Sequence, residues 1–256
     1  MPDYSYVDQP GLLQYLFYPR ADATENPDGS YDYFVTVEDG TRLACRFYEA
    51  DPTWPWMLYF HGNGEVASDY DDIAPFYQLS RINLVVVDYR GYGLSEGRPS
   101  VSNLLTDARQ VLQAVKGEAG KRDADPKLWV MGRSMGSIAA LSLAHHDHQE
   151  LQGLIIESGF ASVTRLITHL GLMAPNLELK AIEEACLKMI KDIYLPALIL
   201  HGDRDTLVPW AEGKLIYDTL GSSAKQMVTI TGASHNDIIF RDLPRYFGAI
   251  HRFLNG

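Results

Sequence analysis

Cysteine is scarce in this chain of 256 residues, which contains only Cys45 and Cys186. The two lie far apart in the sequence, one in a predicted strand and one in a predicted helix, so no second thiol is near enough to make a metal-binding pair. We therefore expect two buried, reduced thiols in preference to a disulfide.

Long apolar runs are also missing. No segment approaches the ~20 consecutive apolar residues of a membrane span. The first twenty residues hold one brief apolar patch, from Leu12 to Tyr18, and they lack the basic start and long apolar run of a signal peptide. The sequence predicts a protein without a membrane span and with a cytoplasmic location.

Positive charge is in deficit, with 22 Lys and Arg residues against 33 Asp and Glu residues and a formal net charge of -11. A nucleic-acid-binding surface must neutralise phosphates, so this balance disfavours nucleic acid as a partner. Hydrophobic residues make up 46% and charged residues 21%, which argues against a disordered or fibrous chain. We expect one domain, residues 1–256, with a sizeable core.

Short apolar segments separated by turns are what the sequence does contain. Residues 31–49 alternate around Asp39-Gly40 and predict a β-hairpin. Near-continuous apolar runs then alternate with helical patterns, and such runs indicate strands that are buried on both faces. The pattern predicts an α/β fold with a mostly parallel, doubly wound sheet that follows an antiparallel hairpin. The predicted strands lie in 54–62, 82–91, 127–132, 151–159, 195–202 and 225–232, and the helices in 101–115, 137–148, 211–220 and 237–254.

One connection is too long for a simple crossover. Residues 160–194 carry two helical segments separated by Ala174-Pro175-Asn176. We predict a small helical cap inserted at about 160–194 into the single domain. A cap that covers a catalytic site at the carboxyl ends of the strands needs an apolar face toward that site. Leu170, Leu172 and Met173 are therefore candidates for binding an acyl group there.

A possible nucleophile lies where a predicted strand meets a predicted helix. Ser134 stands between Gly132 and Gly136 in a G-x-S-x-G sequence, the pattern of a nucleophile elbow. This pattern occurs by chance in roughly one chain in ten of this length, so the assignment depends on partner residues.

Candidate partners follow two other predicted strands. In an open parallel sheet, ligands bind at the carboxyl ends of the strands. Asp205 and His235 follow such strands, in the Ser, Asp, His order of the α/β-hydrolases. A serine needs a base to take its proton, and a carboxylate must orient the imidazole of that base. We predict Ser134 as the nucleophile, His235 as the base and Asp205 as the acid, with Asp203 and Glu157 as alternative acids.

A glycine-rich loop is the candidate for stabilising an oxyanion. Residues 61–65, HGNGE, follow a predicted strand, and glycines allow the backbone to approach a bound ester closely. We expect the backbone N–H groups of Asn63 and of Met135, the residue after the nucleophile, to point at the developing charge.

Five segments together resemble a known family. They are HGNGE (61–65), DYRGYGLSEG (88–97), GRSMG (132–136), HGDRDTLVP (201–209) and GASH (232–235). In this order they are similar to the motifs of the α/β-hydrolase superfamily, most of all to small-capped serine hydrolases of the "alpha/beta hydrolase domain" type. The resemblance runs from about Tyr31 to the C-terminus. It implies an α/β-hydrolase fold and a Ser134-Asp205-His235 triad with Asn63 and Met135 as backbone donors.

The substrate stays open at this level, because the superfamily also includes thioesterases, lipases, peptidases and cofactor-free haloperoxidases. The sequence favours a serine hydrolase that cleaves a small-molecule carboxylic ester without a metal or cofactor. A thioesterase or an amidase/peptidase on the same triad, and a binding protein that keeps the fold without turnover, are the alternatives. In DYRGYGLSEG we expect Asp88 and Arg90 to pair and brace the rim.

Overall fold

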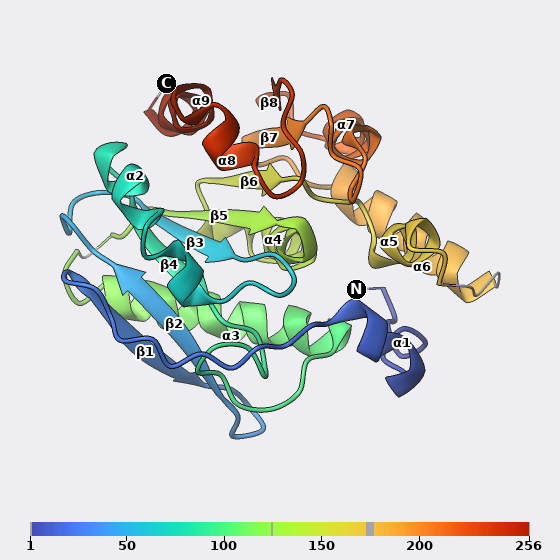
Figure 1. The fold of residues 1–256 in the computed structure, drawn as a ribbon, viewed down its shortest axis with the longest axis horizontal. Helices are drawn as coiled ribbons and strands as arrows, with labels where there is room; N and C mark the ends of the chain where they lie inside the picture. Colours follow the sequence, from blue (N-terminus) through green and yellow to red (C-terminus); the bar gives the residue numbers. More distant parts are fainter. Residues whose placement is uncertain (1, 124, 173–176, 256) are drawn as a thin grey trace.

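The strands form one sheet with the order β1-β2-β4-β3-β5-β6-β7-β8 (Figure 1). A computed structural model describes residues 2–123, 125–172 and 177–255. The predicted hairpin is present, and its second strand also pairs antiparallel with β4, while every later pair is parallel. The predicted α/β fold, with a mostly parallel sheet after an antiparallel hairpin, is confirmed. The strands are β1 (Ser30–Thr36), β2 (Arg42–Tyr48), β3 (Trp56–Phe60), β4 (Asn83–Val87), β5 (Leu128–Arg133), β6 (Gly153–Glu157), β7 (Ala197–Gly202) and β8 (Lys225–Ile230).

Helices cover both faces of this sheet, which explains why the strands read as unbroken apolar runs. Within β3, Leu58 and Phe60 belong to one buried cluster and Met57 and Tyr59 to another. The first cluster includes α3 (Val101–Ala119), α4 (Ser137–His146) and α7 (Trp210–Thr219), and the second includes α2 (Ala74–Leu79) and α9 (Leu243–Asn255). A strand that is covered by helices on both sides has no solvent-exposed face for polar residues.

The structure differs from the predicted helices in three places. The stretch 237–254 is not one helix but two, α8 (Ile238–Arg241) and α9, because Asp242 between them has φ -154° and ψ 74°. The helices α1 (Pro10–Leu16) and α2 are not predicted from the sequence. Both are shorter than the 11-residue window over which a helical apolar period can be recognised.

The segment between β6 and β7 contains α5 (Val163–His169) and α6 (Leu177–Lys191). Ile182, Cys186 and Ile190 of α6 are buried in the first core cluster, and α6 contacts α4 and α7. This helix therefore lies within the helical layer, and α5 is the part of the predicted cap that reaches the carboxyl ends of the strands (Figure 1). The division into domain and cap stays a prediction.

The cysteines are buried free thiols, as predicted. Among the helices of the described ranges, none combines the length and the apolar character needed to cross a membrane.

Candidate active site

Ser134 lies on a strained turn between β5 and α4. Its φ is +50°, in the left-handed region that residues with a side chain seldom adopt. A Cβ atom at Gly132 would overlap the carbonyl of Gly136, and one at Gly136 would overlap the carbonyl of Phe60. The two glycines let strand and helix backbones approach closely enough to make this turn, as the elbow pattern predicts.

A chain of hydrogen bonds joins Ser134 to a histidine and a carboxylate. The Nε2 atom of His235 lies 3.0 Å from Oγ of Ser134, and its Nδ1 atom lies 2.7 Å from Oδ2 of Asp205. All three side chains are buried. The structure thus brings the three predicted residues together in one hydrogen-bonded series, although Ser134 and His235 lie 101 residues apart in the sequence.

The environment of Asp205 favours its charged form. Burial by itself raises the pKa of this carboxyl, but hydrogen bonds from His201 and His235 outweigh burial and hold the pKa well below its ordinary value. The other carboxylate oxygen, Oδ1, accepts the backbone N–H groups of Leu207 (3.0 Å) and Val208 (2.7 Å). A carboxylate held this firmly can orient an imidazole and stabilise its protonated form.

The two alternative acids have other partners. Oδ1 of Asp203 accepts the backbone N–H of Gly232 at 2.6 Å. Oε2 of Glu157 accepts the hydroxyls of Tyr246 (2.5 Å) and Tyr59 (3.3 Å). In the described part of the chain neither carboxylate hydrogen-bonds to the histidine, so the geometry favours Asp205.

The loop with Asn63 is fastened by its side chain. Oδ1 of Asn63 accepts the backbone N–H of Tyr18 (2.9 Å) and the hydroxyl of Tyr92 (2.6 Å), and its Nδ2 donates to the carbonyl of Leu16 (2.8 Å). Asn63 and Met135 line the same cavity as Ser134. The main chain at Asn63 is therefore held in place beside the serine by the N-terminal segment.

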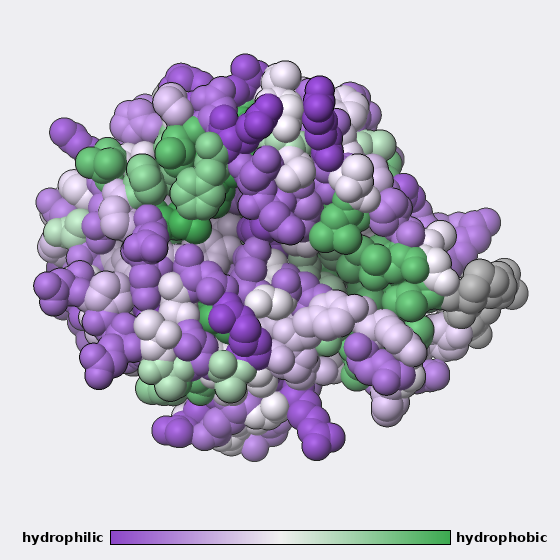
Figure 2. Space-filling view, viewed as in Figure 1, coloured by the Kyte–Doolittle hydropathy of each residue, from purple (hydrophilic) through white to green (hydrophobic). Residues whose placement is uncertain are grey.

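A cavity of about 290 Å³ opens onto Ser134 and His235 and is called here the first cavity. Its walls are mainly apolar, and Leu170 and Leu207 on its rim are exposed. Figure 2 shows an apolar area over α5 on this face of the molecule. Of the predicted acyl-binding residues, Leu170 lines the cavity, Leu172 instead packs against the core, and Met173 lies outside the described residues.

Several residues of the first cavity are not predicted from the sequence. Three of them, Tyr15, Leu16 and Tyr18, come from the N-terminal segment. The other two are Glu65, in the same loop as Asn63, and Asn236, directly after His235. The N-terminal segment precedes the part of the chain that resembles the superfamily, so no motif marked it. Its one signal in the sequence is the brief apolar patch from Leu12 to Tyr18. The hydrogen bond from Tyr18 to Asn63, which connects this segment to the site, joins residues that are 45 positions apart.

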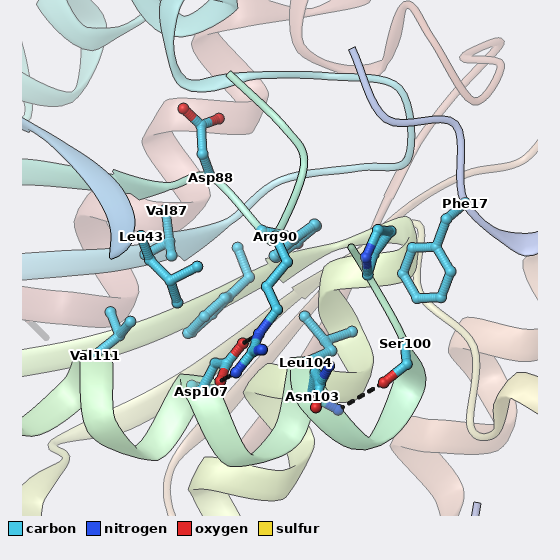
Figure 3. Close-up of a pocket in the computed structure, with 14 residues that line it drawn as sticks. Phe17, Leu43, Val87, Asp88, Arg90, Ser100, Asn103, Leu104, Asp107 and Val111 are labelled. Carbon is cyan, nitrogen blue, oxygen red and sulfur yellow. Dashed lines mark hydrogen bonds and ion pairs between the residues drawn. The ribbon is translucent and has the colours of Figure 1, made fainter. Parts of the chain in front are cut away.

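The predicted pair between Asp88 and Arg90 is wrong. Figure 3 shows the Arg90 guanidinium turned toward Asp107 of α3, to which it donates at 2.7 and 2.8 Å, while Asp88 points away from it. Oδ1 of Asp88 instead accepts the backbone N–H of Ala67 at 2.8 Å. The two side chains leave the loop in opposite directions, so each braces a different neighbour. The pocket in Figure 3 has a volume of only about 10 Å³, too small for a substrate.

Comparison with known proteins agrees with the fold and the motifs. A family model described as "Serine aminopeptidase, S33" (Hydrolase_4) matches residues 55–180 and 173–241. The chain belongs to the Hydrolase_4 family. Its predicted membership of the α/β-hydrolase superfamily is thereby confirmed, and the match supports a hydrolase.

Relatives in sequence and neighbours in structure can be compared with this chain one by one. It is 28% identical to Protein bem46 of Schizosaccharomyces pombe over 227 residues, which are 86% of this chain and 73% of that protein. The Pyrococcus furiosus esterase Pf2001 superimposes with a TM-score of 0.76 at 19% identity, covering 93% of this chain and 98% of the esterase. Est1E from Butyrivibrio proteoclasticus gives a TM-score of 0.69 at 17% identity, covering 88% and 97%. At these identities the two structures show a shared fold.

Proposed function

We propose that this protein is a serine hydrolase that cleaves a neutral carboxylic ester through an acyl-Ser134 intermediate. The observation that carries the proposal is the continuous hydrogen-bonded series from Ser134 through His235 to Asp205 at the mouth of a cavity.

In the first step, Oγ of Ser134 attacks the ester carbonyl while Nε2 of His235 takes the hydroxyl proton. The distance of 3.0 Å between these atoms suits that transfer. Asp205, ionised and fixed by two backbone amides, stabilises the imidazolium. His235 then gives the proton to the leaving alcohol, and a water molecule activated by the same histidine releases the acid.

The negative charge on the carbonyl oxygen needs donors during both steps. The backbone N–H groups of Asn63 and Met135 take that role, and each such donor is typically worth about 10²- to 10³-fold in turnover. The side-chain anchors of Asn63 support this assignment because a donor acts best when it does not have to reorganise.

An ester is favoured over a peptide despite the description of the family. The ammonium group at the amino terminus of a peptide substrate is bound most strongly by a carboxylate that no other cation already neutralises. Glu65 lines the first cavity, but it already binds Arg133 (2.8 Å), the N–H of Gly62 (2.8 Å) and the hydroxyl of Tyr70 (2.7 Å). The name of the Pyrococcus furiosus esterase Pf2001, which shares this fold, also supports ester hydrolysis.

The test is to label the protein with a fluorophosphonate probe and to assay p-nitrophenyl esters from acetate to palmitate, with Ser134→Ala as the comparison. The wild type should label and hydrolyse, and the variant should do neither. A wild type that neither labels nor hydrolyses, or a variant with full activity, would refute the proposal. Thioester and p-nitroanilide substrates with the same acyl group separate the thioesterase and amidase alternatives.

A further inference from the structure

A buried arginine lies beside the proposed nucleophile and takes no part in the reaction described above. Arg133 is the last residue of β5 and directly precedes Ser134. The residues before it in β5 are apolar or glycine, and its own side chain is only 8% exposed. A buried charge requires partners, and the partners of Arg133 come from other segments at this end of the sheet.

The first partner is Glu65, in the loop of Asn63 that follows β3. Nε of Arg133 lies 2.8 Å from Oε1 of Glu65. The other carboxylate oxygen, Oε2, accepts the backbone N–H of Gly62 at 2.8 Å and the hydroxyl of Tyr70 at 2.7 Å. Burial by itself raises the pKa of Glu65, but Arg133 and the Tyr70 hydroxyl outweigh burial and hold that pKa below its ordinary value. The charged Glu65 carboxylate therefore joins the main chain next to Asn63 to the end of β5.

Two further partners connect Arg133 to β6 and to the loop of His235. Nε of Arg133 also lies 3.6 Å from Oε1 of Glu157, the residue opposite it in the β5-β6 pair. Nη2 donates to Oδ1 of Asn236, directly after His235, at 3.4 Å. One guanidinium thus reaches both the loop that follows β3 and the loop that follows β8, while its own backbone continues into the nucleophile turn.

Such a cluster is better suited to fixing geometry than to adding stability. Well-packed apolar residues in place of a buried ion pair often make a protein equally or more stable. A guanidinium, in contrast, holds several N–H donors in one rigid plane, so partners from different loops are fixed relative to one another. That arrangement matters for acyl transfer, because a displacement of about 1 Å can cost about 10²-fold in rate.

We propose that Arg133 is a positioning residue, whose guanidinium fixes the loop that follows β3 and the loop that follows β8 relative to Ser134. The inference rests on the proposed ester hydrolysis and adds to it a residue that acts through Glu65 and Asn236.

The test measures hydrolysis of p-nitrophenyl butyrate per active site, with the sites counted by fluorophosphonate titration to completion. In Arg133→Met, kcat per site should fall by about 10²-fold while KM changes by less than about threefold, because the displaced groups act on the transition state. Arg133→Lys keeps the charge without the planar fork and should recover part of the loss. Arg46→Met is the matched control and should keep kcat per site, since Arg46 of β2 is also buried and also pairs with two carboxylates, Asp32 and Asp71.

The connection through the loop of Asn63 has its own test. Glu65→Gln keeps the length of the side chain but loses the charge that Arg133 binds, so kcat per site should fall by about 10-fold or more. The double variant Arg133→Met/Glu65→Gln should be no slower than Arg133→Met, because both substitutions remove the same interaction. Losses that add would overturn the proposal. If Arg133→Met does not fold, Glu65→Gln decides, and an unchanged kcat per site in that variant would overturn the proposal.

Two outcomes separate this inference from the proposed function. Fewer titratable sites in Arg133→Met with an unchanged kcat per site would show a role in stability alone and would overturn the positioning role. If the wild type hydrolyses no ester, the proposed function fails, and hydrogen–deuterium exchange still decides whether Arg133 holds the loops. Relative to α3, amides in 61–66 and 232–238 should exchange at least about 10-fold faster in Arg133→Met and at the wild-type rate in Arg46→Met. Equal exchange in the wild type and Arg133→Met would overturn the proposal.

Discussion

At the scale of single residues, three carboxylates near the ends of neighbouring strands differ in their contacts. Asp205 binds the imidazole of His235, whereas Asp203 binds a backbone amide and Glu157 binds two tyrosine hydroxyls. In the proposed mechanism Asp205 is therefore the carboxylate that orients the imidazole, and substitution of each of the three tests that assignment.

We expect Asp205→Asn to lower kcat by about 10⁴-fold, because an amide in this position no longer stabilises the imidazolium. Asp203→Asn and Glu157→Gln should each cost far less on p-nitrophenyl butyrate. Steady-state kinetics of the three variants provides the measurement, and the reverse order would reassign the acid.

The low pKa of Asp205 also has a consequence for stability. A carboxyl whose pKa is lower in the folded state binds fewer protons there, so it stabilises the fold above its unfolded pKa of about 3.9. This contribution is lost as the pH falls through the folded pKa. The difference in unfolding free energy between wild type and Asp205→Asn should shrink as the pH falls from about 5 toward about 3. Urea unfolding at each pH measures it, and a difference that grows on acidification would contradict the argument.

At the scale of elements, the junction of β5 and α4 depends on the absence of side chains at Gly132 and Gly136. A Cβ atom at Gly136 meets the carbonyl of Phe60 in β3, and backbone cannot move aside as a flexible side chain can. Gly117, exposed in α3, has open space where a Cβ would stand.

Gly136 and Gly117 should respond in opposite ways to substitution by alanine. Gly136→Ala should destabilise the protein by at least about 1–3 kcal/mol through overpacking and should reduce fluorophosphonate labelling of Ser134. Gly117→Ala should stabilise it by up to about 1 kcal/mol, since alanine is the better helix former. Urea unfolding of both variants beside the wild type tests the pair, and a neutral Gly136→Ala would show that the junction can widen at no cost.

At the scale of the whole molecule, the net charge of -11 acts on any charged substrate. Among the described residues that line the first cavity, there is no Lys or Arg to offset this field locally. If the proposed ester hydrolysis holds, neutral esters should therefore be favoured over anionic ones.

We expect p-nitrophenyl hemisuccinate to have a lower kcat/KM than p-nitrophenyl butyrate at low salt. Raising the ionic strength from about 0.01 M to about 0.5 M should narrow the gap, because salt screens the repulsion of the anion, and should leave the neutral ester nearly unchanged. A ratio that does not respond to salt would place the discrimination in direct contacts within the cavity.

The sequence by itself determined the order of the strands and of the longer helices along the chain, and the positions of Ser134, Asp205 and His235 at strand ends. These features are local: an apolar run, a glycine beside a turn, and a polar residue after a strand each lie within a few residues of one another. The α/β-hydrolase fold followed from several such local signals in one order.

Only the tertiary structure decided which groups meet. Of the three carboxylates it hydrogen-bonds Asp205 to His235, and it pairs Arg90 with Asp107 and makes α1 a wall of the first cavity. Each of these contacts joins residues that are 17 or more positions apart or lie on different elements, and a local pattern does not specify the direction in which a side chain leaves its loop.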